Sequence, residues 1–298
     1  MNPYPKISVV TPSYNQARFL RETIISVLGQ GYPNLEYIII DGGSSDDSRS
    51  IIESYSNQLS YWVSEPDHGQ AHAINKGFRK ATGDILCWLN SDDLFMPGAL
   101  FKMAALADRN KATIHFGNCI HFEDKAGELA TYGSNVVYMS QHHELKHLDY
   151  IIQPSSFWTR KTWELTGELS EEIHFAFDWE WFLRAEKSKV QLVAISDCLS
   201  MYRIHQAHKT GSGGDKRQDE IIKVSSIYAP ERCKLLRLMQ QEKLDFSGLQ
   251  YKVMRKALRT VRIPYTENSL LKKYKFLKYK RYQLKDLEEA RSMLFLSV

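Results

Sequence analysis

The first hundred residues repeat one pattern four times: a short apolar run ends in a cluster of polar residues. The segments between the runs carry apolar residues at the spacing of an α-helix. Short apolar runs that alternate with helices predict a doubly wound α/β sheet whose first strands are parallel. The apolar runs begin near residues 7, 37, 61 and 85, and the polar clusters occupy residues 11–15, 41–45, 65–67 and 90–93.

The position of the polar clusters indicates where a ligand binds. The carboxyl ends of parallel strands meet at one edge of a sheet, and ligands bind beyond that edge. Connecting loops are polar in any case, so a single cluster at a strand end means little. Four clusters at four such ends favour one shared ligand site over four unrelated loops.

Beyond residue 110 the pattern predicts further strands that join the same sheet in mixed orientation. "ATIHFGNCIHF" and "QLVAISDCLSMYRIH" are strand-like, and "FDWEWFLRAEKS" predicts a helix. The polar, glycine-rich residues 208–219 suggest a mobile loop or a domain boundary. We therefore predict one domain over residues 1–210, with halves at 1–110 and 111–210, and a helical extension over residues 211–298.

Two adjacent carboxylates, Asp92 and Asp93, end the fourth apolar run, "GDILCWLNSDD". Carboxylate oxygens are ligands that Mg²⁺ and Mn²⁺ prefer, and these ions often bind substrate phosphate as well. The alternative is helix capping, in which Ser91 or Asp92 caps a helix that begins near Leu94 and has Pro97 in its first turn. The two carboxylates alone do not decide between these roles.

The other strand ends carry side chains that suit a nucleotide. Two glycines follow Asp41, whose carboxylate can bond to the edge of a base or ribose; alternatively it closes an Asx turn. Pro12, Tyr14 and Asn15 form either a wall against a base or a simple strand-to-helix turn.

A polar loop and helix follow the third strand, with the sequence "EPDHGQAHAINKGFRKATGD". Lys76 or Arg79 on this helix can pair with a diphosphate. The alternative is a solvated helix face, which is the usual position of a lysine. The polar and basic side chains on this loop and helix are His68, His72, Asn75, Lys76 and Arg79.

Together these motifs resemble those of glycosyltransferase family 2. The resemblance rests on "VVTPSYNQARFLRETIISVLGQGYPNLEYIIIDGGSSDDS" followed by "GDILCWLNSDD", and it covers roughly residues 5–210. The family has the GT-A fold and uses nucleotide-diphosphate sugars. The resemblance therefore implies a mixed α/β sheet of GT-A type flanked by helices, with a nucleotide-sugar half at residues 1–110 and an acceptor half at 111–210.

The resemblance also implies roles for single residues. Asp41 matches the aspartate that contacts the base, commonly uracil. Asp92 and Asp93 match the DxD-type motif that binds Mn²⁺ or Mg²⁺, with Asp93 as the favoured direct ligand. The family often has a second acid at the position of Gly42, and this departure weakens the inference about the base or ribose. The candidate nucleotide-binding residues are Pro12, Tyr14, Asn15, Asp41, Asn75, Lys76, Ser91 and Asp92.

The segment "FAFDWEWFLRA" is similar to the family's "ED…R" helix, whose aspartate deprotonates the acceptor hydroxyl. That residue is Asp178 here, with Phe177 in place of the usual glutamate and Glu180 as the alternative base. Aromatic neighbours suit a general base, because partial shielding from water raises a carboxyl pKa. Alternatively, Asp178 only caps the helix. Arg184 either orients Asp178 or pairs with Glu180 one turn away.

Three further features complete the predicted site. The resemblance implies that His205 completes the metal shell or contacts the diphosphate, although a lone histidine is more often structural. Trp158 either stacks on an acceptor sugar or packs in the core. The QxxRW motif of processive family members is absent downstream, which favours addition of a single sugar over polymer synthesis.

Charge is divided unevenly along the chain. Residues 250–298 contain 13 Lys and Arg against 4 Asp and Glu, whereas residues 1–249 contain 26 against 31. In this basic tail Leu270, Tyr274 and Leu277 fall near one helical face. Such a helix suits an anionic membrane surface, where each basic residue contributes about 1 kcal/mol; a solvated helix face is the alternative. We find no module that reads nucleic acid and expect no nucleic-acid partner.

Composition predicts a cytoplasmic protein. The four cysteines show no metal-ligand spacing and lie in or beside apolar runs, as buried free thiols of a reducing compartment do. The sequence has neither a signal-peptide pattern nor an apolar run near the roughly 20 residues that span a membrane. The basic tail adds the expectation of peripheral contact with the inner face of the plasma membrane.

We therefore expect an inverting, metal-dependent glycosyltransferase that moves one sugar from a nucleotide diphosphate, with UDP-sugars as the favoured donors, to an acceptor hydroxyl. The expected pathway is the synthesis of a cell-surface polysaccharide, a lipopolysaccharide or a lipid-linked glycan. One alternative is a sugar nucleotidyltransferase, which would carry a glycine- and arginine-rich phosphate loop where this chain has "TPSYNQARF". The other is a non-catalytic, membrane-associated scaffold of the same fold. The acids at Asp41, Asp93 and Asp178 count against a scaffold.

Overall fold

A computed structural model describes residues 4–125, 128–205, 209, 213–241, 256 and 282–295. It divides the chain into two compact units. The first unit comprises Met1–Leu145 and Tyr150–Ser212, and the second comprises Lys146–Asp149 and Gly213–Val298. The boundary predicted after residue 210 lies two residues before the division after residue 212.

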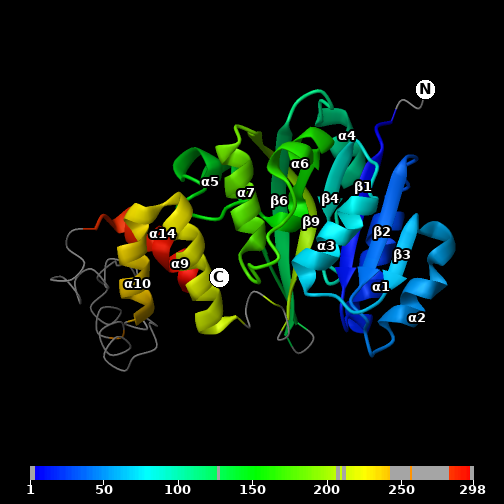
Figure 1. Ribbon diagram of the computed structural model, residues 1–298, viewed down its shortest axis with the longest axis horizontal. Helices are drawn as coiled ribbons and strands as arrows, with labels where there is room; N and C mark the ends of the chain where they lie inside the picture. Colours follow the sequence, from blue (N-terminus) through cyan, green and yellow to red (C-terminus); the bar gives the residue numbers. More distant parts are fainter. Residues whose placement is uncertain are drawn as a thin grey trace. The chain divides into compact units, whose positions relative to one another are not determined.

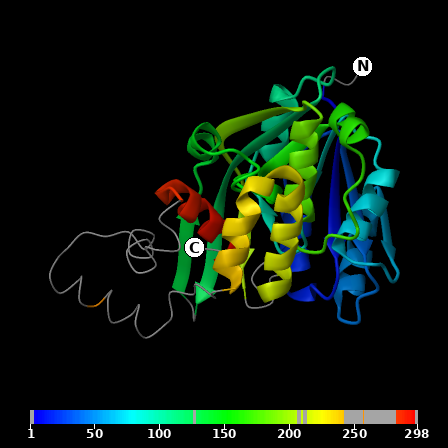
Figure 2. The ribbon, with the colours of Figure 1, turned by 60° about the vertical axis from the view of Figure 1, so that its left-hand side comes forward.

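Strands and helices alternate at the start of the first unit. They are β1 Ile7–Ser13, α1 Ala17–Leu28, β2 Leu35–Asp41, α2 Ser48–Ser54, the 3-10 turn η1 Ser56–Gln58, β3 Tyr61–Ser64, α3 Gln70–Lys80 and β4 Ile85–Trp88. The four strands are parallel, as predicted, and stand in the order β3-β2-β1-β4. β1 and β2, in blue, lie side by side in Figure 1 and in the turned view of Figure 2. Their carboxyl ends therefore share one edge of the sheet.

Helices pack on the sheet through alternate residues of β1. Val9 belongs to the buried cluster that contains Leu20 and Ile24 of α1. The next residue, Val10, faces α3, where a Cβ on Gly77 would lie only 2.4 Å from a Val10 methyl group. Gly77 thus lets α3 approach the sheet closely, because successive strand residues point to opposite faces.

The later strands join the same sheet in mixed orientation, as predicted. The remaining elements of the first unit are β5 Leu94–Phe95, α4 Ala99–Leu106, β6 Thr113–Lys125, β7 Glu128–Gly133, α5 Val136–His142, the 3-10 turn η2 Gln153–Ser155, β8 Ser156–Thr159, α6 Arg160–Thr166, α7 Phe177–Lys187 and β9 Gln191–Ile204. β8 lies antiparallel between β4 and β6, and β9 runs parallel to β6. Within the described residues the order is β3-β2-β1-β4-β8-β6-β9-β5, with β7 beside β6.

The prediction that a helix begins near Leu94 is wrong. Leu94 and Phe95 form β5 instead, because they pair with Met201 and Ser200 of β9. The next helix, α4, begins only at Ala99. Neither Ser91 nor Asp92 is therefore in position to cap a helix, and the capping alternative for the carboxylate pair is excluded.

An aromatic cluster lies in the core beside β4 and β8. Trp158 is 1% exposed, and its ring centroid lies 5.3 Å from that of Trp88, 4.8 Å from that of Trp181 and 5.7 Å from that of Phe78. A ring buried against three others cannot stack on a sugar in solvent. The acceptor role predicted for Trp158 is therefore wrong, and its place is the core.

Glu36, the second residue of β2, carries a buried carboxylate. It accepts hydrogen bonds from Oγ of Ser8 at 2.5 Å and from the N–H of Thr82 at 2.6 Å, and it pairs with Nζ of Lys6 at 2.6 Å. Burial by itself raises a carboxyl pKa, but these hydrogen bonds outweigh burial and lower the pKa of Glu36 from 4.5 to about 2.

Glu36 should therefore stabilise the fold in a pH-dependent way. Because its folded pKa lies below the unfolded value, its contribution is fully present above pH 4.5 and is lost as the pH falls toward about 2. We expect Glu36→Gln to lower the free energy of unfolding at neutral pH by about 2 kcal/mol and to flatten its decline below pH 4.5. Urea unfolding near neutral pH and near pH 3 measures both effects.

The matched control is Glu53→Gln, which removes an exposed carboxylate paired with Arg49 at 2.9 Å. This change should alter the free energy of unfolding by less than about 0.5 kcal/mol. If Glu36→Gln kept the acid sensitivity of the wild type, the proposed source of that sensitivity would be wrong.

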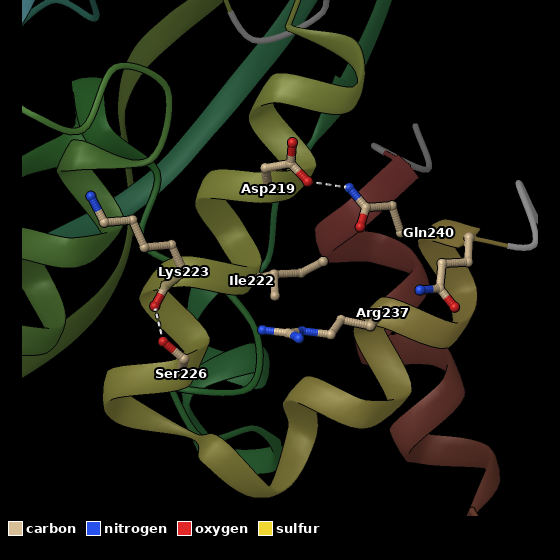
Figure 3. A pocket seen from close by; sticks show the side chains of 7 residues that line it. Asp219, Ile222, Lys223, Ser226, Arg237 and Gln240 are labelled. Carbon is tan, nitrogen blue, oxygen red and sulfur yellow. Dashed lines mark hydrogen bonds between the residues drawn. The ribbon is translucent and has the colours of Figure 1, made fainter.

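The second unit contains the described helices α9 Gly214–Tyr228, α10 Cys233–Gln241 and α14 Leu284–Phe295, with the turn η3 Pro230–Arg232. Buried Arg232 pairs with Glu289 and, at 3.4 Å, with Asp286, which joins α14 to the turn before α10. A groove of about 450 Å³ lies between α9 and α10, where Asp219 accepts a hydrogen bond from Gln240 at 2.6 Å (Figure 3).

The lipid-contacting residues predicted in the basic tail, Leu270, Tyr274 and Leu277, lie outside the described residues. Among the helices of the described ranges, none is both long and apolar enough to span a membrane.

Candidate active site

The loop after β1 is bonded to the loop after β2. Asn15, in the left-handed conformation at φ 52°, accepts the N–H of Ser45 through Oδ1 at 2.9 Å, and its own N–H donates to Oγ of Ser44 at 2.8 Å. Asparagine tolerates this conformation better than most residues. At the start of α1, the N–H of Ala17 donates to Asp46 at 2.9 Å. The two loops at the sheet edge therefore form one bonded unit.

The residues predicted as a wall against a base divide into two groups. Pro12 is buried inside β1, opposite Ile40 of β2. The side chain of Tyr14 is 62% exposed, and Asn15 beside it is exposed as well. Ser13, between them and Pro12, is buried, and within the described residues its Oγ has no hydrogen-bond partner. Tyr14 and Asn15 are thus open to a ligand, whereas Pro12 only supports the strand.

Asp41 is fully buried at the end of β2. Its carboxylate accepts the N–H of Ser44 at 2.9 Å, Oγ of Ser44 at 2.6 Å and Oγ of Ser64 at 2.7 Å. These bonds give Asp41 the local turn-closing role that the sequence offered as the alternative, although the N–H that it accepts lies three residues on and not two as in an Asx turn. In this structure Asp41 holds the loop after β2 and does not present its carboxylate at the surface, which corrects the predicted direct contact with a base.

Gly42, where the family often has a second acid, lies against Asp67. A Cβ at this position would lie 2.6 Å from Oδ2 of Asp67, which is closer than two such atoms can approach. Asp67 is fixed by its own bond, since Oδ1 accepts the N–H of Gly69 at 2.8 Å. The space of a side chain at position 42 is therefore filled by a carboxylate from the loop before α3.

The predicted nucleotide contacts on α3 are occupied by protein partners. Asn75 is buried; it donates to the carbonyl of Leu169 at 3.0 Å and accepts the N–H of Leu169 at 2.9 Å. The nucleotide-binding role of Asn75 is therefore wrong, because its amide holds the loop after α6. Lys76 forms an ion pair with Glu65 and its side chain is 20% exposed, so it is partly solvated and already paired with a carboxylate.

Asp92 and His205 lie together beyond the ends of β4 and β9. Oδ2 of Asp92 and Nε2 of His205 are 3.0 Å apart, and their side chains are 19% and 13% exposed. The His205 ring is supported by the ring of Phe19, with a centroid distance of 4.6 Å. The structure thus places His205 in direct contact with Asp92, and the metal-binding role predicted for it stays a prediction.

Asp93 is 1% exposed and turns away from this contact. Its Oδ1 accepts the N–H of Arg203 at 3.1 Å, and its Oδ2 accepts from Nδ2 of Asn90 at 3.2 Å. Burial, and secondly the charge of Asp92, raise the pKa of Asp93 well above its usual range. Asp93 therefore supports the turn, and its burial argues against the predicted preference for Asp93 as direct metal ligand. Ser91, also predicted, is buried in the same turn.

The pair of Asp92 and His205 fits a divalent ion. Adjacent ligand atoms of an octahedral ion with bonds of about 2.1 Å lie about 3.0 Å apart, which matches the 3.0 Å between Oδ2 and Nε2. No group of three or more His, Cys, Asp and Glu in the described ranges is arranged to hold a metal. An ion here would therefore take its other ligands from phosphate and water.

Asp178 lies in the first turn of α7, half-buried, where its Oδ1 accepts the N–H of Trp179 at 2.8 Å. This bond agrees with the capping alternative and leaves the catalytic role as a proposal. Glu180 is buried and pairs with Arg184 through two bonds of 3.2 and 2.9 Å. Arg184 also donates to the carbonyl of Thr166 at 2.9 Å. Arg184 thus takes the alternative role of partner to Glu180.

A polar chain connects the start of α7 with the end of β4. Nζ of Lys209 lies 5.0 Å from the ring centroid of Phe177 and donates to Oε1 of Gln70 at 3.0 Å. Gln70 in turn donates to Oδ1 of Asn90 at 2.8 Å. The rings of Phe177 and Trp88 also lie within 6.2 Å of each other. These contacts bring Phe177, the residue before Asp178, close to Asn90, which lies two positions before Asp92.

Sequence reasoning missed Gln70, Lys209 and Arg203. Gln70 and Lys209 carry no motif, so only the fold brings them to the site. Arg203 had a usable signal, because residues two apart on a strand point to the same face. A strand through His205 therefore predicts that Arg203 faces the same carboxylates.

The sequence profile of Glycosyl transferase family 2 matches residues 8–165, which is more than half of the chain. The chain belongs to glycosyl transferase family 2. This family 2 enzyme is 24% identical over 282 residues to an uncharacterized glycosyltransferase of Rickettsia typhi, a match that covers 91% of this chain and 83% of that protein. It is 39% identical over 131 residues to an uncharacterized glycosyltransferase of a Nostoc species, covering 42% of this chain and 41% of that one.

Several solved structures share the fold of this family 2 enzyme. Staphylococcus aureus TarS matches with a TM-score of 0.60 and 18% identity, over 97% of this chain and 54% of TarS. TarS 1–349, solved with UDP-GlcNAc, matches with a TM-score of 0.59 and 16% identity, over 97% of this chain and 90% of that one. The Pyrobaculum calidifontis mannosyltransferase PcManGT, solved with GDP-Man and Mn²⁺, matches with a TM-score of 0.60 and 16% identity, over 99% and 88%. The predicted GT-A fold is confirmed.

Proposed function

We propose that this glycosyltransferase moves one sugar, with inversion, from a nucleotide diphosphate to an acceptor hydroxyl and that it requires Mn²⁺ or Mg²⁺. The observation that carries the proposal is the contact between Asp92 and His205, 3.0 Å apart at a strand end. Two protein ligands leave positions on a divalent ion for the phosphates of a donor. The Mn²⁺ and GDP-Man bound by PcManGT and the UDP-GlcNAc bound by TarS 1–349 support this donor class.

The donor nucleotide would lie against the bonded loops after β1 and β2. The exposed ring of Tyr14 offers an aromatic face for a base, and Asn15 offers its amide at the same edge. Asp41 supports this site indirectly: its carboxylate accepts a hydrogen bond from Oγ of Ser44, and that Oγ accepts a hydrogen bond from the N–H of Asn15. UDP-sugars are the first donors to test, since the motifs resemble those of UDP-sugar users.

Asp92 and His205 would hold the ion. When bound, the ion supplies positive charge that neutralises the departing nucleoside diphosphate. Asp93 and Asn90 keep the turn in place beneath Asp92, through their 3.2 Å hydrogen bond.

Asp178 is the proposed general base. It takes the proton of the acceptor hydroxyl while that oxygen forms a bond to the anomeric carbon. The bond from the anomeric carbon to the diphosphate oxygen breaks, and its electron pair leaves with the nucleoside diphosphate. A single displacement on the opposite face inverts the configuration. Glu180 is the poorer base, because it is buried in its ion pair with Arg184.

The acceptor that we propose is a cell-surface polysaccharide or a lipid-linked glycan. The support is the charge of residues 250–298, which would bring the enzyme to the anionic inner face of a membrane. Addition of a single sugar follows from the absent QxxRW motif in the sequence.

Release of nucleoside diphosphate from a panel of UDP-, GDP- and dTDP-sugars, with and without Mn²⁺, tests the proposal. We expect one donor to release nucleoside diphosphate only when metal is present. The same donor should raise the melting temperature of the protein in the presence of Mn²⁺, because a ligand that binds only the folded state stabilises it. If no donor were hydrolysed, transferred or bound with Mn²⁺, nor with Mg²⁺ in its place, the proposal would lose its support.

A further inference from the structure

Arg203 on β9 contacts the turn that carries Asp92, helix α1 and two aromatic rings. Its guanidinium lies over two aromatic rings, 4.8 Å from the centroid of Phe19 and 4.6 Å from that of Phe122. Only 15% of the side chain is exposed. A planar cation held over two rings has few other positions open to it.

The same residue bonds to both members of the carboxylate pair. Nε of Arg203 donates to the backbone carbonyl of Asp92 at 3.1 Å, and the backbone N–H of Arg203 donates to Oδ1 of Asp93 at 3.1 Å. The far end of the guanidinium donates to Glu22 of α1 at 2.5 Å. Thr23 of α1 adds a hydrogen bond of 2.8 Å to the carbonyl of Asp93. The turn that carries Asp92 is thus tied to α1 and β9 at once.

The geometry points to Arg203 as a positioning residue for the metal site, an inference that rests on the proposed function. His205 follows Arg203 by two residues and lies just beyond the end of β9, so one backbone segment carries one proposed ligand and the anchor of the other. We infer that Arg203 fixes the Asp92 turn against His205 and so keeps the two donors 3.0 Å apart. Arg203 itself touches neither metal nor substrate in this role. A residue that orients a ligand in this way typically affects metal affinity or activity by about 10–100-fold.

Lysine cannot replace arginine in this arrangement. The guanidinium presents several N–H donors in a rigid fork, which allows Arg203 to reach the Asp92 carbonyl and Glu22 together. A lysine ammonium keeps the charge but is a single point on a flexible stem. The change Arg203→Lys therefore removes the positioning while it retains the positive charge near Asp93.

The test is the affinity for Mn²⁺ in the presence of UDP, measured as loss of the free Mn²⁺ signal in electron paramagnetic resonance. We expect Arg203→Lys to raise the half-saturating Mn²⁺ concentration by about 10–100-fold. The matched control is Arg18→Lys, because the Arg18 guanidinium also lies over Phe19, at 5.0 Å, but Arg18 is exposed on α1. It should stay within about twofold of the wild type.

The outcomes separate this inference from the proposed function. If the wild type binds Mn²⁺ with UDP and Arg203→Lys binds it equally well, the inference is overturned and the proposed function stands. If the wild type binds no Mn²⁺, both are overturned. Should Arg203→Lys fail to fold, Arg203→Gln is the variant to test in its place, because glutamine keeps an N–H donor. The same loss of Mn²⁺ affinity is expected. A lowered melting temperature with unchanged Mn²⁺ affinity would give Arg203 a merely structural role and would also overturn the inference.

Discussion

Replacing Asp92 with asparagine is expected to lower the rate of sugar transfer by at least about 100-fold at Mn²⁺ concentrations that saturate the wild type. The neutral amide keeps the shape of the side chain but is a much poorer ligand for a hard divalent ion. The change also removes the charged oxygen of one of the two proposed metal ligands, Asp92 and His205, whose side-chain atoms lie 3.0 Å apart. Because Asp92 is partly exposed in a turn, the fold should survive the change, and excess Mn²⁺ should restore part of the activity.

Nucleoside diphosphate release as a function of Mn²⁺ concentration measures this effect. The control is Asp108→Asn, which changes an exposed aspartate that pairs with Lys111 at 3.4 Å. Its rate should remain within about twofold of the wild type. Wild-type rates for Asp92→Asn at every metal concentration would show that Asp92 is not a ligand.

Replacing Asp178 with asparagine should lower the turnover by about 10²–10⁴-fold while donor binding is retained. An asparagine amide cannot accept the proton of the acceptor hydroxyl, but it can still accept the N–H of Trp179 that the carboxylate accepts at 2.8 Å. The helix start should therefore remain intact. Stabilisation of the protein by donor and Mn²⁺ should equal that of the wild type, because Asp178 acts on the acceptor side.

Turnover and donor-dependent thermal shift, measured on the same preparation, separate a base from a structural residue. Asp197→Asn serves as the control, since Asp197 is a partly exposed partner of Lys102 at 2.9 Å. Unchanged turnover in Asp178→Asn would exclude it as the base. Loss of the donor-dependent shift together with turnover would instead assign Asp178 a role in the fold or in donor binding.

Much of the fold could be predicted from the sequence because its signals are local. Apolar runs at residues 7–10, 37–40 and 85–89 form strands that are buried on both faces. Such runs predict a strand even when the neighbouring strands are unknown. The strand β5 is different. Its two residues, Leu94 and Phe95, form a strand only because Met201 and Ser200 pair with them from far along the chain. The false helix cap on Asp92 arose from that missing partner.

The candidate site was predicted less well than the fold, because residue type does not reveal burial. Asp92 and Asp93 are equivalent in sequence, yet β9 buries one and leaves the other beside His205. Asn75 is a plausible ligand for a nucleotide until Leu169, 94 positions away, takes its amide. Trp158 suits a sugar or a core equally, and only the rings around it decide.

The bonds between the loops after β1 and β2 have a consequence for engineering the enzyme. The N–H groups of residues 15, 16 and 17 donate to side chains of the second loop and of the first residue of α2, at Ser44, Ser48 and Asp46 respectively. A loop transplanted alone from a relative would lose these acceptors and leave the start of α1 uncapped. Chimaeras that aim to exchange donor preference should therefore move residues 13–17 and 41–48 as a single cassette.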